Sequence, residues 1–414
     1  MFSLGLLQWK QAKTGGGGLK TTCISTVRLM AGVDEIFRRA KEGRALFIDR
    51  NALTPDYVPE KLPFRDEQTK AVAEVLAPVL HGSKPSNLLL YGKTGTGKTA
   101  VAKYVLSRLE AEADRTKLAV AYVNTRHANS EYRTVTELGR AAGIELPFTG
   151  LSVGEALGRV FKEMKAKTMH MILVMDEIDY LVNTHGDSIL YEFTRSNEQL
   201  SPGFLSIVGI SNDLKFKEAL DPRVLSSLSE EELVFPPYTV DELREILTER
   251  AKVAFRPGVA TSGSINLIAA MAGSEHGDAR RAIDLLRVAG EVAEREGLAK
   301  VDDSCVSKAS DKMEHDRVEE AISSLPIQSK AILRAIWNFK DGTNTGKLYV
   351  AYRNNARDMG IDILTQRRMS GILAELDLLG LVQASVVSKG RRGRTKKIQL
   401  LVDDDTMRKT LSNS

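Results

Sequence analysis

The sequence has few of the residues that build disulfide frameworks and metal centres. It contains two cysteines, Cys23 and Cys305, and six scattered histidines among 414 residues. Two cysteines so far apart give neither a disulfide framework nor a metal-ligand spacing, and such sparse use fits a reducing compartment. The sequence also has no apolar run that approaches the ~18 residues of a membrane-spanning helix. These absences argue against a disulfide-stapled secreted protein, a histidine- or cysteine-based metal centre and a membrane span.

The charge of the chain is small overall but unevenly distributed. The net charge is +4, and 43% hydrophobic with 27% charged residues is typical of a globular protein. From Asp316 to the end there are 17 Lys and Arg against 11 Asp and Glu, whereas the rest of the chain has 41 against 43. A positive excess confined to the C-terminal part favours a polyanionic partner at that end.

The most informative stretch is LLLYGKTGTGKTA, residues 88–100, which combines a buried strand, a glycine-rich turn and the start of a helix. Gly92, four further residues and then Gly97-Lys98-Thr99 match the spacing G-x-x-x-x-G-K-[ST]. The glycines allow backbone N–H groups to converge on an anion at the positive end of the helix. Lys98 is placed to reach the β- and γ-phosphates, and the Thr99 hydroxyl is placed to hold Mg²⁺. The stretch predicts binding of a nucleoside triphosphate with Mg²⁺, and the expected cofactors are ATP, its hydrolysis product ADP, and Mg²⁺.

Two acidic residues follow the apolar strand MHMILVMDEID, in which Asp176 and Glu177 stand at the C-terminal end. Ligands of open α/β sheets bind at this edge. We expect Asp176 to hold Mg²⁺ or its water shell and Glu177 to activate the attacking water. An Asp-Glu pair after a strand is common, but 78 residues after Lys98 it is the expected second half of the site.

Two polar residues further along the chain are candidates for sensing the γ-phosphate. Asn212 ends the strand FLSIVGISN and can reach the lytic water, although asparagine is equally suited to a plain turn. Arg280 opens a helix in GDARRAIDLLR, with Asp278 placed to cap it. An arginine there can bend over the phosphates, whereas its neighbour Arg281 better fits a solvated side chain.

The order of the expected elements predicts an α/β base followed by helical parts. From Leu88, strands alternate with helices as in a parallel sheet, until Pro236-Pro237 ends the pattern. Helices then form a small lid, a polar segment links it onward, and three helices with a hairpin predict a winged helix-turn-helix. The expected divisions are 1–29, a disordered tail; 30–238, the base; 239–300, the lid; 301–317, the linker; 318–403, the winged helix; and 404–414, a tail.

The final domain carries the residues expected to bind DNA. Thr365 is a candidate N-cap for the recognition helix, whose first turn holds Gln366, Arg367 and Arg368. The hairpin tip SKGRRGRTKK has six basic residues and no acid. A bound phosphate backbone would relieve the repulsion between these like charges. The alternative is a solvated turn. Those six residues are Lys389, Arg391, Arg392, Arg394, Lys396 and Lys397.

The succession GKTGTGKT, MDE, GISN and GDAR resembles the AAA+ ATPases, and the chain resembles more closely the archaeal origin-recognition and cell-division-control initiator family. The resemblance runs from about Leu46 to Val402. Its most specific stretches are YVPEKLPFRDEQ, NTRHANSEYR, DPRVLSSLSEEELVFPPY, GDARRAIDLLR and TQRRMSGILAELDLLGLV with the basic hairpin after it. It implies an AAA+ parallel sheet flanked by helices, a helical lid and a winged helix.

The resemblance assigns further residues by position. It places Val58 and Pro59 near the adenine, and makes Tyr238 and Arg250 further nucleotide contacts. Asn212 and Arg280 become the first and second sensors. The phosphate loop comprises Gly92, Lys93, Thr94, Gly95, Thr96, Gly97, Lys98 and Thr99, with Ala100 beside it.

In two places the resemblance is less specific. AAA+ proteins often carry an arginine finger in a Ser-Arg pair, but here Ser226-Ser227 stand in that region, and Arg223 is the nearest candidate. Arg126 and Arg133 resemble an initiator-specific element that touches DNA, although surface arginines are nearly as good an interpretation.

The resulting hypothesis is a DNA replication initiator that binds duplex origin DNA. ATP binding and slow, switch-like hydrolysis would control recruitment or loading of the replicative helicase, together with other initiator paralogues, in the cytoplasm at the nucleoid. The alternative is an AAA+ motor like a clamp loader or chaperone, with a winged helix that binds protein. The basic hairpin and TQRR favour DNA.

Overall fold

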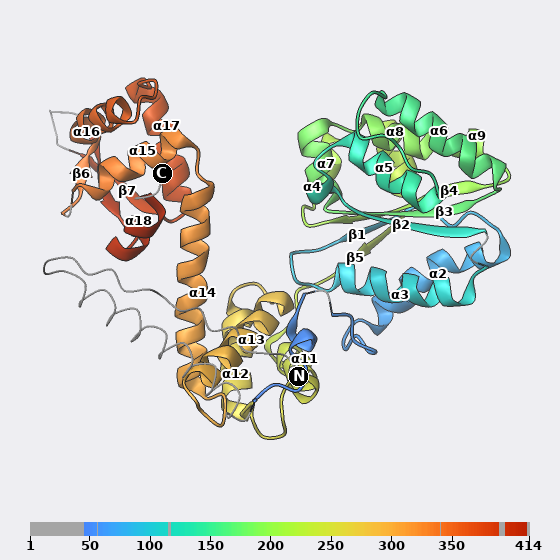
Figure 1. The fold of residues 1–414 in the computed structure, drawn as a ribbon, viewed down its shortest axis with the longest axis horizontal. Helices are drawn as coiled ribbons and strands as arrows, with labels where there is room; N and C mark the ends of the chain where they lie inside the picture. Colours follow the sequence, from blue (N-terminus) through green and yellow to red (C-terminus); the bar gives the residue numbers. More distant parts are fainter. Residues whose placement is uncertain (1–44, 56, 115–116, 340, 389–393, 412–414) are drawn as a thin grey trace, which may run out of the picture.

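The computed structural model describes residues 45–55, 57–114, 117–339, 341–388 and 394–411 (Figure 1). The expected tail at 1–29 therefore lies outside the described residues. Among those that are described, no helix combines the length and the apolar character needed to cross a membrane.

The base is built on a parallel sheet of five strands in the order β2-β3-β4-β1-β5. Its strands are β1 (Leu88–Tyr91), β2 (Leu118–Asn124), β3 (His170–Asp176), β4 (Phe204–Ser211) and β5 (Glu231–Val234). Every residue of β3 and β4 is buried, as expected for central strands covered on both faces. Because the strands are parallel, their C-terminal ends meet at one edge, where the predicted site residues follow.

Helices cover both faces of this sheet (Figure 1). Alternate side chains of β3 divide between the two layers: Ile172 and Val174 pack with one set of helices, and Leu173 with the other. The first set is α2 (Asp66–Leu76), η2 (Ala77–His81) and α3 (Lys98–Glu112). The second set, with the short helices near it, is α4 (Thr125–Ala128), α5 (Glu131–Ala142), α6 (Val153–Ala166), α7 (Ile178–His185), α8 (Ser188–Arg195), α9 (Asn197–Leu200), η3 (Phe216–Ala219) and α10 (Pro222–Leu228).

The lid consists of α11 (Val240–Ala254), α12 (Ser262–Ser274) and α13 (Ala279–Arg295), which lie within the expected lid range of 239–300. Residues 46–53, which were expected in the base, also pack here: η1 (Arg50–Leu53) contributes Leu53, and Phe47 packs against Phe255 with ring centroids 4.5 Å apart. The N-terminal segment thus belongs to the core of the lid, although the base separates the two in the sequence.

The segment 301–317 differs from the expectation of a polar linker. It forms most of α14 (Asp303–Ser324), a continuous helix that runs from the lid to the last domain (Figure 1). Cys305 and Val306 are buried in the lid core, whereas Ile322 at the other end is buried in the next core. The helix is held by packing at both ends, so its middle can remain polar.

The C-terminal domain has the three helices and the hairpin of a winged helix, together with a short strand between its first two helices and a helix after the hairpin. Its elements are α15 (Ile327–Trp337), β6 (Thr343–Asn344), α16 (Thr345–Asp358), α17 (Gln366–Leu378), β7 (Val382–Ser388), β8 (Arg394–Leu400) and α18 (Asp404–Leu411). The antiparallel sheet has the order β6-β8-β7. Residues 404–411 were expected in a tail, but they form α18, which buries Met407 and Leu411 against this core.

Candidate functional site

The glycine-rich turn predicted from the sequence joins β1 to α3. Its backbone has positive φ at Gly92 (156°), Gly95 (73°) and Gly97 (93°), values that glycine adopts without steric cost. The Lys98 ammonium group donates hydrogen bonds to the carbonyl oxygens of Gly92, at 2.7 Å, and Lys93, at 2.8 Å. The structure gathers in this single turn and the start of its helix all the predicted loop residues: Gly92, Lys93, Thr94, Gly95, Thr96, Gly97, Lys98, Thr99 and Ala100.

Lys98 is a buried cation, and only 4% of its surface is exposed. Burial lowers its pKa to about 8, the nearby Asp176 opposes that shift, and the positive charge of Arg280 adds to it. A buried ammonium group that lacks a full ionic partner attracts an anion to the turn. A phosphate group would supply the missing negative charge.

Asp176 meets the start of α3 across the edge of the sheet. Its Oδ2 accepts a hydrogen bond of 2.9 Å from the Thr99 hydroxyl, and the Tyr122 hydroxyl donates to the same oxygen. Burial and this hydrogen bond raise the pKa of Tyr122, so its hydroxyl stays protonated and remains a donor. A hydroxyl beside a carboxylate is a hard oxygen donor set that fits Mg²⁺. The described residues contain no cluster of three or more His, Cys, Asp or Glu suited to a metal, so Mg²⁺ here would take its other ligands from water and phosphate.

Glu177 directly follows β3 with a left-handed backbone, φ 56°. Its carboxylate is engaged by two groups at and just after the end of β2: the Asn124 amide donates a 3.3 Å hydrogen bond, and the Arg126 guanidinium lies 3.7 Å away. These contacts depend on the sheet order, because the pairing of β2 with β3 sets Asn124 opposite Asp176. The carboxylate that was predicted to activate water therefore contacts a neighbouring side chain through each of its oxygens.

The two predicted sensors lie on different elements. Asn212 follows β4, which pairs with β1, and its backbone N–H donates to Asp179 at 3.3 Å. Arg280 lies in the first turn of α13, where the preceding residue, Ala279, donates from its N–H to Gly95 O at 3.2 Å. The start of the lid helix is thus docked on the glycine-rich turn, with Arg280 close enough to influence the charge of Lys98.

The hinge between base and lid carries the predicted Tyr238. Its backbone N–H donates to Gly277 O at 3.3 Å, and its hydroxyl abuts Gly97, where an added Cβ would lie 2.8 Å from Oη. Arg250 donates to the carbonyl oxygens of Ala52, at 3.1 Å, and Tyr57, at 3.3 Å. It thereby ties α11 to the chain just before Val58 and Pro59, which are placed beside the lid rather than in the turn itself.

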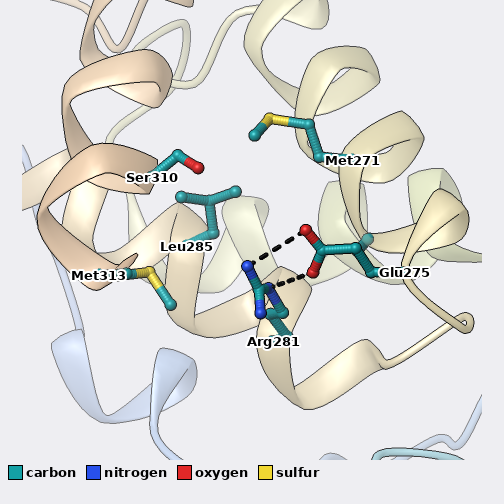
Figure 2. Close-up of a pocket in the computed structure, with 7 residues that line it drawn as sticks. Met271, Glu275, Arg281, Leu285, Ser310 and Met313 are labelled. Atoms are coloured by element: carbon teal, nitrogen blue, oxygen red, sulfur yellow. Dashed lines mark hydrogen bonds and ion pairs between the residues drawn. The ribbon is translucent and has the colours of Figure 1, made fainter. Parts of the chain in front are cut away.

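Arg281 joins the lid to α14. Figure 2 shows its guanidinium group against Glu275, with Met313 of α14 nearby; the Nε–Oε2 distance is 2.6 Å. Arg281 also pairs with Glu314 of α14. The side chain that was expected to be solvated therefore has two acidic partners.

The predicted recognition helix is α17. Thr365 caps it, accepting a hydrogen bond of 3.4 Å from the Arg368 N–H, and Gln366, Arg367 and Arg368 are all exposed in its first turn. Lys396 and Lys397 lie on β8, whose pairing with β7 sets Arg394 opposite Ser388. The other predicted wing residues, Lys389, Arg391 and Arg392, lie outside the described residues.

Comparisons with known proteins agree with this three-part architecture. Residues 61–208 match the AAA ATPase domain family, 244–311 the Cdc6 AAA+ ATPase-type lid domain, and 320–410 the CDC6 C-terminal winged helix domain. The chain is 47% identical over 384 residues to ORC1-type DNA replication protein 1 of Sulfurisphaera tokodaii, which covers 92% of this chain and 96% of that protein. The chain belongs to the ORC1-type DNA replication protein family.

Other members of the family are similar to this chain over nearly its whole length. The Pyrococcus furiosus ORC1-type DNA replication protein is 46% identical over 389 residues, 92% of this chain and 93% of that protein. The solved structure of the Aeropyrum pernix ORC1 protein in complex with DNA is similar, with 47% identity and a TM-score of 0.80 over 90% of this chain and 98% of that one. The predicted fold class and the resemblance to the archaeal initiator family are confirmed.

The remaining arginines predicted for this ORC1-type chain are at the surface of the base. Arg223 on α10 is exposed, and its Nε lies 3.6 Å from Oδ1 of Asp221, two residues before it. Arg133 on α5 is exposed, and Arg126 is two-thirds exposed although it also reaches Glu177. A surface position suits both a macromolecular contact and a solvated side chain.

The sequence reasoning missed Tyr122, Asn124 and Arg65, which contact the site. Asn124 was overlooked because its role depends on β2 lying beside β3, which the strand order in the sequence does not reveal. Arg65 was overlooked because arginine is normally a surface residue, yet here it is only 2% exposed. The only available signal was its place within the family-like stretch YVPEKLPFRDEQ.

Proposed function

We propose that the protein is a DNA replication initiator. In this proposal it binds duplex origin DNA through the winged helix, with help from the base, and uses ATP binding and slow hydrolysis to control recruitment or loading of the replicative helicase. The observation that carries the proposal is the joining of a phosphate-binding turn, a docked lid helix and an exposed basic recognition helix in one chain. The proposed setting is the cytoplasm, at the nucleoid.

The nucleotide would bind between the turn and the lid. The backbone N–H groups of the glycine-rich turn and Lys98 would hold the phosphates, while Val58, Pro59, Tyr238 and Arg250 would surround the base and sugar. Thr99 and Asp176 would hold Mg²⁺, which supplies positive charge to the phosphate oxygens. Arg280 and Asn212 would distinguish ATP from ADP at the γ-phosphate.

Slow hydrolysis is supported by the position of Glu177. Its carboxylate can take a proton from water only if it is free to approach that water. In the described conformation the Asn124 amide and the Arg126 guanidinium occupy both carboxylate oxygens. A phosphate backbone that attracted Arg126 would remove one of these restraints, so DNA binding and hydrolysis would be coupled through this arginine.

DNA binding is supported by the exposed polar side chains of α17 and by the charge of the C-terminal part. Gln366, Arg367 and Arg368 stand in the first turn of the helix that enters the major groove in proteins of this architecture. The basic residues of the hairpin and Thr365 would contact the backbone, and Arg126 and Arg133 would add contacts from the base. The solved relative, the Aeropyrum pernix ORC1 protein, is in complex with DNA.

The test is binding of the full chain to duplex DNA fragments, measured by fluorescence anisotropy with ATP, with ADP and without nucleotide. We expect binding in each state, a preference among sequences, and nucleotide-dependent affinity. Absence of duplex binding, together with capture of a protein partner by the winged helix, would favour the alternative of an AAA+ motor. Recruitment of a purified replicative helicase to bound DNA would then be measured by pull-down, with and without other initiator paralogues.

A further inference from the structure

Arg65 is a buried arginine next to the glycine-rich turn. It immediately precedes α2, and the residue before it, Phe64, has a left-handed backbone with φ 61°. This region is unusual for an aromatic residue and persists only where the surroundings require it. The sharp turn at Phe64 directs the chain so that the Arg65 side chain enters the protein.

The guanidinium group of Arg65 contacts three separate parts of the chain. Its Nε donates to Thr96 O at 2.9 Å, its Nη2 to Pro236 O at 2.6 Å and its Nη1 to Phe64 O at 2.8 Å. It also lies 3.8 Å from the centroid of the Tyr238 ring. One side chain therefore joins the turn, the hinge and the entry to α2.

The charge of Arg65 is not neutralised by a direct ionic partner. None of the carboxylates in the part of the chain that the structure describes forms an ion pair with it, and all its hydrogen bonds go to carbonyl oxygens. Burial lowers its pKa, an effect that Tyr238 and Glu242 oppose, yet a guanidinium group remains charged in proteins. An unpaired buried cation costs stability, which indicates that it serves a purpose other than packing.

The bond to Thr96 O has a direct geometric consequence. In a trans peptide the C=O and the N–H of the same unit point in opposite directions. When Arg65 holds the carbonyl of Thr96, the N–H of Gly97 must point away from Arg65. Gly97 has φ 93° and begins the phosphate-binding Gly-Lys-Thr, so this N–H is one of those available to an anion.

We propose that Arg65 is a positioning residue for nucleotide binding: it orients the Thr96–Gly97 peptide toward the phosphate and holds the hinge at Pro236 and Tyr238 in register with the turn. The inference rests on the proposed nucleotide-binding function. The Tyr238 hydroxyl abuts Gly97 from the same side, so the turn and the hinge are fixed as one unit.

The test compares nucleotide affinity with stability in matched variants of the full chain. Arg65→Gln removes the charge and the planar guanidinium group. Arg65→Lys keeps the charge but cannot donate to the carbonyl oxygens of Thr96 and Pro236 at the same time. Val72→Ala, in the buried face of α2, destabilises the same region without touching the turn. Titrations with fluorescent ATP and ADP give the affinities, and urea unfolding gives the stability of each variant.

We expect Arg65→Gln to weaken the binding of both nucleotides by about tenfold or more, with Arg65→Lys between it and the wild type. Val72→Ala should bind nucleotide as the wild type does. The inference is overturned if Arg65→Gln keeps wild-type affinity, or if Val72→Ala loses affinity equally at the same stability. If Arg65→Gln does not fold, wild-type affinity in Arg65→Lys overturns it. If the wild type binds nucleotide no better than Lys98→Ala does, the proposed nucleotide-binding function itself is wrong, independently of the role of Arg65.

Discussion

The backbone N–H of Ala279 donates a hydrogen bond to the carbonyl oxygen of Gly95, at a distance of 3.2 Å. The two residues lie 184 positions apart and belong to the lid helix and the glycine-rich turn. The contact is close because Gly95 has no side chain: an added Cβ would lie 1.8 Å from Oδ1 of Asp278, the residue that caps α13. The turn and the lid helix α13 are therefore positioned by each other.

Gly95→Ala should separate the lid helix from the turn. The new methyl group would displace Asp278 and with it Arg280, so we expect ATP affinity to fall by about tenfold or more. Gly258→Ala is a matched control, because its φ of 79° is close to the 73° of Gly95 but no atom lies within 4 Å of its added Cβ. Both variants carry a similar backbone strain of about 1 kcal/mol. Equal nucleotide affinity in the two variants would contradict the proposed role of the docked lid.

The sequence predicted the parts of the site that depend on local pattern. A strand, three glycines and a helix start suffice to place Lys98 and Thr99, and the apolar strand before Asp176 suffices to place that carboxylate at the sheet edge. The partners of Glu177 could not be predicted in this way. Asn124 and Arg126 reach it because β2 lies beside β3, and strand order is determined by tertiary packing rather than by any one segment.

The helix α14 was difficult to predict for a related reason. Its sequence has no continuous apolar face, since Cys305 and Val306 pack in one core and Ile322 in another. Apolar residues recur at helical spacing only where one face of the helix packs against a single core along its length. The sequence of a helix that joins two cores therefore resembles that of a polar linker. The short helix α18 contributes only a few buried side chains, Met407 and Leu411 among them, too few for a periodic signal.

Nucleotide affinity should depend on pH through Lys98. Its pKa is about 8 in the nucleotide-free protein, compared with an ordinary 10.5, and phosphate binding should raise it again. We therefore expect ATP affinity to decrease as the pH rises above about 8, by at most about tenfold per pH unit, with proton uptake on binding. Calorimetric titrations between pH 7 and about 10, in buffers of different ionisation enthalpy, measure both effects.

The effect of Lys98 on stability has the opposite sign. Because its pKa is lower in the folded than in the unfolded chain, the folded protein binds fewer protons between pH 8 and 10.5. Its burial destabilises the fold below pH 8, and this cost disappears as the pH rises through that window. Lys98→Arg should abolish both pH dependences, because arginine stays protonated throughout. An unchanged profile in this variant would show that another group titrates.

Glu177 should be required for hydrolysis but not for binding. Glu177→Gln keeps the shape of the side chain and removes its ability to accept a proton, so ATP should bind with near wild-type affinity and persist. Phosphate release should fall by about a hundredfold or more. Hydrolysis at the wild-type rate would refute the assignment of this residue as the base.

Asn124→Asp should release Glu177 and accelerate hydrolysis. The amide of Asn124 holds the Glu177 carboxylate, whereas its Oδ1 caps α4 by accepting from the His127 N–H. Aspartate keeps the capping oxygen but replaces the donor with a negative charge, so the helix should be retained and Glu177 repelled. We expect a severalfold higher rate of phosphate release without DNA. A lower rate would indicate that Asn124 supports the catalytic position of Glu177 instead of restraining it.

The wing and the recognition helix should contribute differently to DNA binding. Arg391 and Arg392 lie among glycines in the hairpin sequence and are expected to contact phosphates, so replacing both with Ala should weaken binding to every duplex. The slope of log affinity against log salt should become shallower by about one or two units. Gln366 and Arg367 are exposed at the start of α17, so their replacement should instead reduce the preference between sequences. Anisotropy titrations at several salt concentrations measure both quantities, and unchanged ATP hydrolysis without DNA shows that each variant is folded. If the double wing variant keeps its affinity and its salt slope, the basic tip is a solvated turn, and a winged helix that binds protein becomes the better hypothesis.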